Sequence, residues 1–334
     1  YRSPRFSPDG ETVVFEKGSG GYLTAPEWSE NEGVYRVPAN GGEMVRVTDS
    51  GSDPHFGASN DRIFVTRGGG GASLVSMDLD GDNERTHVTG ELVTGYQVSP
   101  DGTHVAFRQN YDVFVQPLLP GPQSVSGGRG GSALPTVEVS GNGGSYFHWS
   151  GSGDAVHWSM GPTFYTATVA EFRPDPTGER EYTPPTEGVN LSMTATADRP
   201  TGMVALTNAR IITMAGEDGG VIETGTIVID GNRIAAIGAD VAVPEGARVV
   251  YLDGRTITPG FIDAHAHGPQ GTGDIIPEQN WSAIAHLALG VTTIHDPSSQ
   301  ASHIFTAGEY QRAGRYLAPR IYSTGEIVYG ARAA

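Results

Sequence analysis

Two histidines separated by one residue, His265 and His267, have the type and spacing needed to bind a metal ion. In an extended strand, residues two positions apart point to the same face, so both imidazoles can reach one ion at the end of a strand. Imidazole nitrogen suits Zn²⁺ and similar divalent ions. A bound ion of this kind acidifies water and polarises a carbonyl group. The pair therefore predicts a divalent metal site, with Zn²⁺ preferred and one or two ions bound.

Two further side chains are candidates for supporting this site. Asp263 shares the face of the histidine pair by strand alternation, which suits a group beneath the metal that orients a ligand, or a buried and paired carboxylate. His295 ends a later apolar run, where it would contact substrate or a metal ligand; we favour the alternative of a half-exposed histidine satisfied by a loop carbonyl. His286 and His303 fall on expected helices and are given no chemistry. Ligand spacing is absent from the remaining histidines, at 55, 87, 104, 148 and 157.

The elements that must position these residues alternate between strand and helix patterns. Apolar side chains recur at helical spacing from Trp281 to Leu289, and Gly290 follows as a helix-ending residue. A second helix is expected over approximately 302–312. This order predicts a parallel sheet with right-handed crossovers. Its strands are expected at 260–264, 291–294 and 320–323.

Residues 203–252 have a different pattern, of short strands in close succession. Gly231-Asn232 is a hairpin turn signal between two of them. The pattern predicts a small β-sandwich over 201–258, and the Pro- and Thr-rich residues 171–200 before it are expected to connect two domains. The five strands are expected at 203–206, 209–214, 225–230, 233–238 and 248–252.

The first 170 residues contain a weak internal repeat. Turn-forming phrases start at Phe6, Phe56, Val98 and Trp149, which are 50, 42 and 51 residues apart, and each is followed by a short β-rich run. In two of them the phrase is Ser-Pro-Asp-Gly, in which Pro presets φ and Gly takes the left-handed position of a hairpin turn. A period in this range, built from short strands and tight turns, is typical of propeller blades. The alternative is an open β-sandwich with chance similarity among its turns.

The sequence around the histidine pair resembles a known family. The phrase TPGFIDAHAHG at 258–268 resembles the first barrel strand of the amidohydrolase superfamily, and GVTTIHD at 290–296 resembles its second strand. The resemblance extends from about 203 to the end of the chain, and it implies a (β/α)₈ barrel with His265 and His267 as metal ligands. The repeated turns resemble those of TolB-type propellers. The resulting organisation is multidomain: propeller blades at 1–170, a connector at 171–200, a β-sandwich at 201–258 and the start of a barrel at 259–334.

The family pattern requires more ligands than this chain supplies. It asks for a carboxylated Lys or a Glu, two further His and an Asp from later strands. Lys17 is the single lysine of the sequence, so no lysine carbamate can come from the barrel segment. A whole barrel needs about 200–250 residues. We therefore expect a truncated barrel that is inactive by itself, with the remaining catalytic residues unassigned and further propeller blades upstream.

The resemblance implies a hydrolase that acts on C–N bonds of amides, cyclic amides or Xaa-Pro-like peptides. Large secreted or periplasmic amidohydrolases related to imidazolonepropionases and Xaa-Pro dipeptidases are similar in organisation, which predicts the same location here. One alternative is a non-catalytic propeller that binds a protein or peptide, followed by a vestigial barrel. Another is an ester or phosphoester hydrolase on the same fold.

The composition indicates which classes of binding partner and which kinds of chemistry are expected. The net charge is −17, which disfavours nucleic acid and anionic membranes as partners and leaves a small molecule or peptide as the expected substrate. No apolar run approaches the length of about 18 residues that a membrane-spanning helix needs. Cysteine is absent, which excludes disulfides, thiolate ligands and cysteine nucleophiles.

Overall fold

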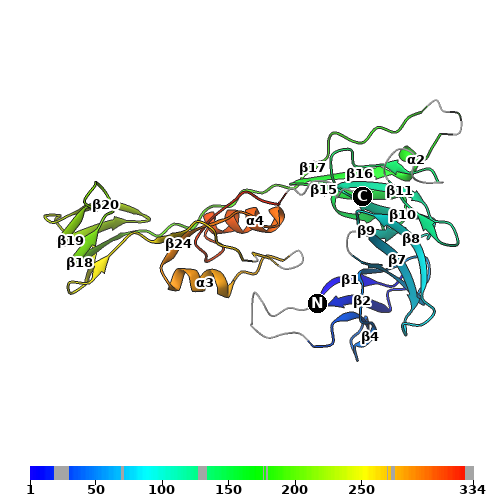
Figure 1. Cartoon of the computed structure of the whole chain (residues 1–334), viewed down its shortest axis with the longest axis horizontal. Coiled ribbons are helices and arrows are strands. Elements are labelled where there is room, and N and C mark those ends of the chain that lie inside the picture. Colours follow the sequence, from blue (N-terminus) through cyan, green and yellow to red (C-terminus); the bar gives the residue numbers. More distant parts are fainter. Residues whose placement is uncertain are drawn as a thin grey trace. The chain divides into compact units, whose positions relative to one another are not determined.

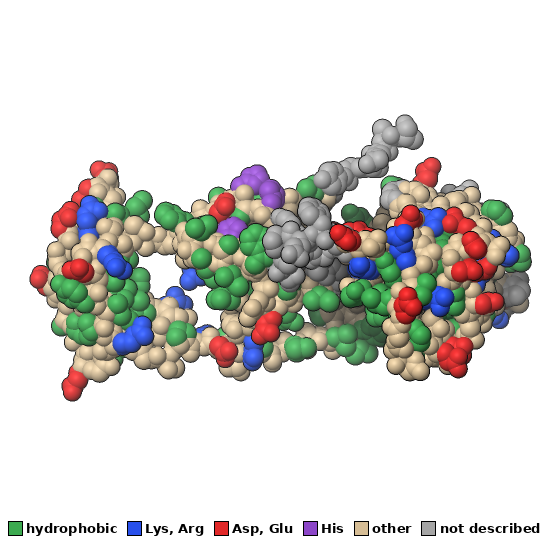
Figure 2. All heavy atoms as spheres, turned by 90° about the horizontal axis from the view of Figure 1, so that it is seen from below, with side chains coloured by type: hydrophobic (Ala, Val, Ile, Leu, Met, Phe, Trp, Pro, Cys, Tyr) green, Lys and Arg blue, Asp and Glu red, His purple; other side chains and the backbone are tan. Residues whose placement is uncertain are grey.

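The computed structural model describes residues 1–18, 30–68, 71–126, 134–175, 177, 180–268, 270–271 and 275–327. These residues form two compact units, the first ending at Met193 and the second beginning at Thr194 (Figure 1). Within the described part of the chain, no helix has the length and apolar character needed to cross a membrane. On the face of the first unit shown in Figure 2, acidic and basic side chains are interspersed.

The first unit is built from four sheets that follow one another along the chain. The first sheet contains β1 (Arg2–Phe6), β2 (Thr12–Lys17), β3 (Gly33–Pro38) and β4 (Val45–Thr48). The second contains β5 (Ser52–Phe56), β6 (Arg62–Arg67), β7 (Gly71–Asp78) and β8 (Arg85–Glu91), with β12 (Gln123–Ser124) added in parallel to β8. The third contains β9 (Val93–Val98), β10 (His104–Gln109), β11 (Asp112–Pro117) and β13 (Val137–Glu138). The fourth contains β14 (Ser145–Trp149), β15 (Ala155–Met160), β16 (Thr163–Thr168) and β17 (Val189–Asn190), and α2 (Val169–Phe172) follows β16.

The repeated turn phrases join the first and second strands of every sheet, as the hairpin interpretation predicts. Ser7 Oγ donates to Asp9 Oδ1 at 2.5 Å and accepts the Thr12 N–H at 2.9 Å. The same contacts, at the same distances, link Ser99 to Asp101 and to His104. Left-handed φ angles of 75°, 73° and 76° are found at Gly10, Gly102 and Gly153.

Alanine substitutions at two glycines of the fourth turn distinguish the effect of backbone strain on stability from that of steric crowding. An alanine at Gly153 would keep a φ of +76° and cost about 1–2 kcal/mol of stability, because a Cβ is disfavoured in that conformation. An alanine at Gly151 meets no atom within 4 Å and needs no left-handed φ, so it should leave stability unchanged or raise it slightly. Urea unfolding followed by tryptophan fluorescence compares the two variants. Equal destabilisation by both would contradict the conformational explanation.

Consecutive sheets of the first unit pack through apolar faces. Val14 and Val34 of the first sheet meet Ile63 and Val65 of the second in one core cluster. The next two clusters join the second sheet to the third and the third to the fourth, where Trp158 is fully buried. Among the described residues, no core cluster joins the first sheet to the fourth. The sheets correspond to the predicted repeat, while their closure into a propeller stays a prediction.

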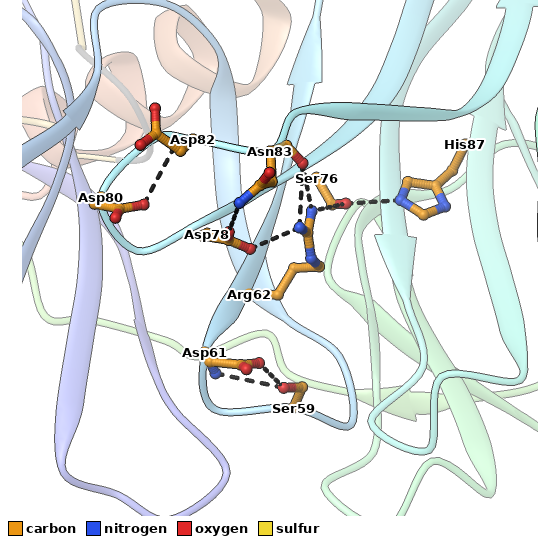
Figure 3. A network of polar contacts seen from close by, with 9 residues as sticks. All are labelled: Ser59, Asp61, Arg62, Ser76, Asp78, Asp80, Asp82, Asn83 and His87. Atoms are coloured by element: carbon orange, nitrogen blue, oxygen red, sulfur yellow. Dashed lines mark hydrogen bonds and ion pairs between the residues drawn. The ribbon is translucent and has the colours of Figure 1, made fainter.

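A polar network links β6, β7 and β8, the three inner strands of the second sheet (Figure 3). Arg62 donates to Asp78 Oδ1 at 2.6 Å and to Ser76 Oγ at 2.9 Å. Ser76 Oγ also lies 2.7 Å from His87 Nε2. Burial, followed by the nearby charges of Arg62 and Arg85, lowers the pKa of His87. At pH 7 the cluster therefore uses His87 as a neutral hydrogen-bonding partner of Ser76.

The second unit begins with one five-stranded sheet instead of the expected β-sandwich. Its order is β20-β19-β18-β21, and β22 also pairs with β18. Two predicted strands, 203–206 and 209–214, merge into the single strand β18, whose pairing shifts near Asn208, where φ is 53°. Because β18 pairs with β21 along its first half and with β22 along its second, one sheet incorporates all five strands. The bounds are β18 (Met203–Ile212), β19 (Val221–Asp230), β20 (Arg233–Gly238), β21 (Arg248–Tyr251) and β22 (Thr256–Ile257).

A three-stranded parallel sheet with two connecting helices follows, which confirms the predicted strand–helix alternation. Asn280 caps the first helix by accepting two backbone N–H bonds, and Gly290 ends it with a φ of +85°. Three described strands do not form a closed barrel, so the (β/α)₈ architecture remains a prediction. The elements are β23 (Phe261–Asp263), α3 (Trp281–Ala288), β24 (Val291–Asp296), α4 (Ala301–Arg312) and β25 (Arg320–Ser323).

Candidate metal centre

The histidine pair lies beyond the strand that was expected to contain it. Strand β23 ends at Asp263, whose Oδ1 accepts the backbone N–H of His265 at 3.1 Å. An Asp that bonds the backbone two residues ahead makes a local turn, and this competes with continued strand pairing. His265 and His267 therefore lie in the loop at the carboxyl end of β23, and Asp263 orients the backbone of His265 and not its imidazole.

The two imidazoles nevertheless converge. Their Nε2 atoms are 2.9 Å apart, and the rings meet edge to face, at 76°. Two nitrogen ligands of a tetrahedral Zn²⁺ ion, each about 2.0–2.1 Å from the metal, are separated by about 3.3 Å. A shift of a few tenths of an ångström would therefore place both nitrogens on one ion. The donor set of this pair fits two positions of a zinc site.

Asp296 supports the pair from the adjacent strand. It is the last residue of β24 and is only 1% exposed, while its Oδ1 lies 3.2 Å from His267 Nδ1 and accepts the Ser298 N–H at 3.0 Å. A carboxylate at this position holds the proton of His267 on Nδ1 and leaves the Nε2 lone pair free for a metal. Asp296 lies two residues after Ile294 and therefore shares its buried face of β24. This spacing could have identified Asp296 from the sequence, although His295 was the residue singled out there.

The side chains of Asp263 and His295 stay apart from the imidazole pair. Among the described residues, neither side chain makes a hydrogen bond to the imidazole of His265 or His267. The backbone carbonyl of His295 accepts the Ala266 N–H at 3.0 Å, which ties the histidine loop to β24. The ligand-orienting contact that we had expected from one of these side chains is made by Asp296.

A pocket of about 400 Å³ opens beside His267 and Asp296. Its other walls come from the loops after β23 and β24, and from the first turn of α4. His303 lines this pocket and is 9% exposed, although the sequence placed it outside the site. It reaches the pocket because α4 begins at the same edge of the parallel sheet at which β23 and β24 end.

Buried hydrogen bonds anchor the loop that follows His267. Tyr316 donates to Gln270 Oε1 at 3.1 Å, and both side chains are less than a tenth exposed. Burial raises the pKa of Tyr316, and a hydrogen bond with Asn280, the cap of α3, opposes that shift. The loop is therefore connected to α3 and to the segment after α4.

The described residues do not complete a metal centre. No group of three or more His, Asp or Glu side chains with metal-binding geometry is found among them. The single lysine, Lys17, lies on β2 of the first unit, where its Nζ donates to the Glu30 carbonyl at 2.6 Å. The ligands expected from later barrel strands are therefore not replaced by other side chains of the described second unit.

The relatives found by sequence match a small part of the chain. The chain is 45% identical over 65 residues to an imidazolonepropionase of Roseobacter denitrificans, and 47% identical over 64 residues to that of Caulobacter vibrioides. Each match covers 18% of this chain, which spans only 16% of the length of either relative. No model of a known protein family matches the chain. The matches support a relationship to the amidohydrolase superfamily.

Solved structures superpose only in part. A Xaa-Pro dipeptidase with bound methionine is 21% identical, with 38% of this chain and 34% of that chain covered at a TM-score of 0.30. A protein designated TolB from Agrobacterium tumefaciens is 16% identical, with 40% and 48% covered at a TM-score of 0.29. TM-scores of this size do not establish a shared fold.

Proposed function

We propose that this chain supplies part of the metal centre of a hydrolase that acts on C–N bonds of amides, cyclic amides or Xaa-Pro-like peptides. The observation that carries the proposal is the convergence of His265 and His267 at their Nε2 atoms, with Asp296 on the opposite nitrogen of His267. The similarity to imidazolonepropionases supports this choice of reaction class.

Each residue of the site has a separate task in this proposal. A divalent ion, when bound, would supply an acidified water molecule and a Lewis acid for a carbonyl oxygen. His265 and His267 would hold the ion through their Nε2 lone pairs. Asp296 keeps His267 in the tautomer that leaves its Nε2 available. The pocket beside His267 has room for a small substrate or the end of a peptide.

The metal content of the purified full chain tests the proposal. We expect zinc in the chain by elemental mass spectrometry, and its loss in the His265→Ala/His267→Ala double variant, because both nitrogens of the pair are removed. The His148→Ala/His157→Ala double variant is the matched control, since it removes two histidines of the first unit and should retain the zinc.

Absence of zinc after dialysis against zinc-containing buffer would contradict the proposal. Equal zinc content in both double variants would also contradict it, because the metal would then be held elsewhere. The alternative of a non-catalytic propeller followed by a vestigial barrel predicts no zinc. Zinc that depends on His265 and His267 would therefore argue against that alternative.

A further inference from the structure

The first strands of the four sheets in the first unit end around a common pocket. The repeated turns that follow these strands complete its walls, and its volume is about 840 Å³. Pockets that bind small molecules have volumes of about 300–1,000 Å³. The core clusters that join each sheet to the next hold the walls in place. The arrangement of the pocket therefore depends on contacts within the described sheets.

One polar side chain from each sheet occupies the same position in the pocket wall. It belongs to the residue before the last of each first strand, which is Arg5, His55, Gln97 or His148. His55 Nε2 accepts the backbone N–H of Val98, so this position faces the next sheet along the chain. Arg5 shares the face of Val14, its cross-strand partner, which packs against the second sheet in a core cluster. Arg5 therefore lies on the side of the first sheet that faces the second.

The guanidinium of Arg5 keeps most of its hydrogen-bond donors free. Its Nη1 donates to the carbonyl of the adjacent Pro4 at 3.1 Å. In the described part of the chain it takes part in no ion pair. Burial lowers the pKa of His55, and the positive charge of Arg5 adds to that shift, which places this charge near the second sheet. A guanidinium in this state can bind a carboxylate through two parallel hydrogen bonds.

Gln97 provides a second free polar group, two sheets further along the pocket wall. Outside the strand pairing, its backbone carbonyl accepts the Trp149 Nε1–H at 2.9 Å. Its side-chain amide makes no hydrogen bond to any residue that the structure describes. An amide of this kind can both donate and accept, so it suits a second polar group of the same ligand.

The acidic side chain in the described pocket wall already has its own partners. Asp101 Oδ1 accepts the Ser99 hydroxyl at 2.5 Å and the Thr103 N–H at 3.0 Å, while Oδ2 accepts the Thr103 hydroxyl at 2.8 Å. Pro100 and Trp149 add apolar surface to the wall. The pocket thus combines free donors with apolar surface, and its carboxylate is held by the adjacent turn.

We propose that this pocket binds an organic acid that carries an apolar group, with its carboxylate on Arg5. Gln97 contacts a second polar group of the ligand, such as an amide, and the apolar group lies against Pro100 and Trp149. A small free acid and the C-terminus of a peptide both present this chemistry. The site lies within the first unit and requires no metal ion, so it is separate from the histidine pair of the proposed hydrolase.

Isothermal titration of the full chain with N-acetylphenylalanine tests this site. We expect Arg5→Gln to weaken binding about 10- to 100-fold, because hydrogen bonds to a charged group are lost. Arg85→Gln removes an exposed arginine of β8 outside the pocket and is the matched control, which should bind as the unmodified chain does. N-Acetylphenylalanine amide lacks the carboxylate and should bind the unmodified chain as weakly as the acid binds Arg5→Gln. This comparison requires no variant, so it holds even if circular dichroism shows that Arg5→Gln is misfolded.

A second acid, 3-phenylpropionate, distinguishes the two sources of the carboxylate. It lacks the amide, so binding as tight as that of N-acetylphenylalanine would indicate a small organic acid, and weaker binding would indicate a peptide C-terminus. Gln97→Ala should weaken binding of N-acetylphenylalanine about 2- to 10-fold, the effect of one neutral hydrogen bond.

Three results would overturn the proposal. The first is that neither acid binds at millimolar concentration, and the second is that N-acetylphenylalanine and its amide bind equally. The third is that binding is lost in the His265→Ala/His267→Ala variant, because the carboxylate would then be held by the histidine pair. An effect of Arg85→Gln as large as that of Arg5→Gln would remove the specific role of Arg5 and overturn it too.

Discussion

Zinc binding by the full chain is expected to weaken about 10- to 100-fold when Asp296 is replaced by Asn, because a carboxylate behind a metal-binding histidine increases the basicity of that ligand and fixes its tautomer. Asn is close in size and can still accept the Ser298 N–H, so the local turn should be preserved. The change therefore removes mainly the negative charge beside His267 Nδ1. Isothermal titration with zinc measures the change in the dissociation constant.

His295→Ala is the matched control for this experiment. His295 precedes Asp296 on β24, and only its backbone contacts the histidine loop. The variant should bind zinc as the unmodified chain does, because removal of the imidazole leaves the backbone bond to Ala266 in place. If His295→Ala weakened binding as much as Asp296→Asn, the role assigned to Asp296 would be wrong.

The first unit is expected to lose about 2–3 kcal/mol of stability between pH 7 and pH 4.5 through His55 alone. Burial lowers the pKa of His55 from its ordinary value of 6.5 to about 4. Below pH 6.5 the unfolded chain takes up a proton that the folded chain accepts only near pH 4. The stability that neutral His55 provides is therefore complete above pH 6.5 and is lost as the pH falls towards 4.

His55→Gln isolates this contribution. Glutamine offers an acceptor for the Val98 N–H but does not titrate, so its stability should fall less steeply with acid. Urea unfolding at pH 7, 6, 5 and 4.5 gives the two curves, and their difference should grow by about 2–3 kcal/mol as pH decreases. Parallel curves would mean that the pKa of His55 is not lowered in the folded chain. Carboxylates with lowered pKa, such as Asp9 and Asp154, contribute equally to both proteins.

Local signals in the sequence located most of the elements. The turn phrases at Phe6, Phe56, Val98 and Trp149 mark hairpins because their Pro, Gly, Asn, Asp and Ser residues favour turn conformations irrespective of distant contacts. The apolar spacing from Trp281 and the position of Gly290 defined α3 within one residue of its observed end. These features depend on the conformational preferences of a few adjacent residues, and such preferences can be inferred from the sequence alone.

Pairing between distant strands was harder to foresee. The bulge near Asn208 that merges two predicted strands into β18 depends on which neighbours pair along each half of the strand. His55 and His148 hold equivalent positions directly before Phe56 and Trp149, which the sequence alone indicates. The difference in their burial could not be inferred from the sequence, because it depends on whether another sheet packs on each of them.

The sequence by itself determined the histidine pair, the likeness to amidohydrolases and the order of strands and helices around the site. Only the tertiary structure decided that Asp296, and not Asp263 or His295, contacts the imidazole of His267, and that His303 lines the adjacent pocket. Side chains from β23, β24 and α4 meet because parallel strands bring their carboxyl ends to one edge of the sheet. Which of two neighbouring side chains turns inward at that edge is set by strand register and by the turn after Asp263, and neither follows from residue spacing alone.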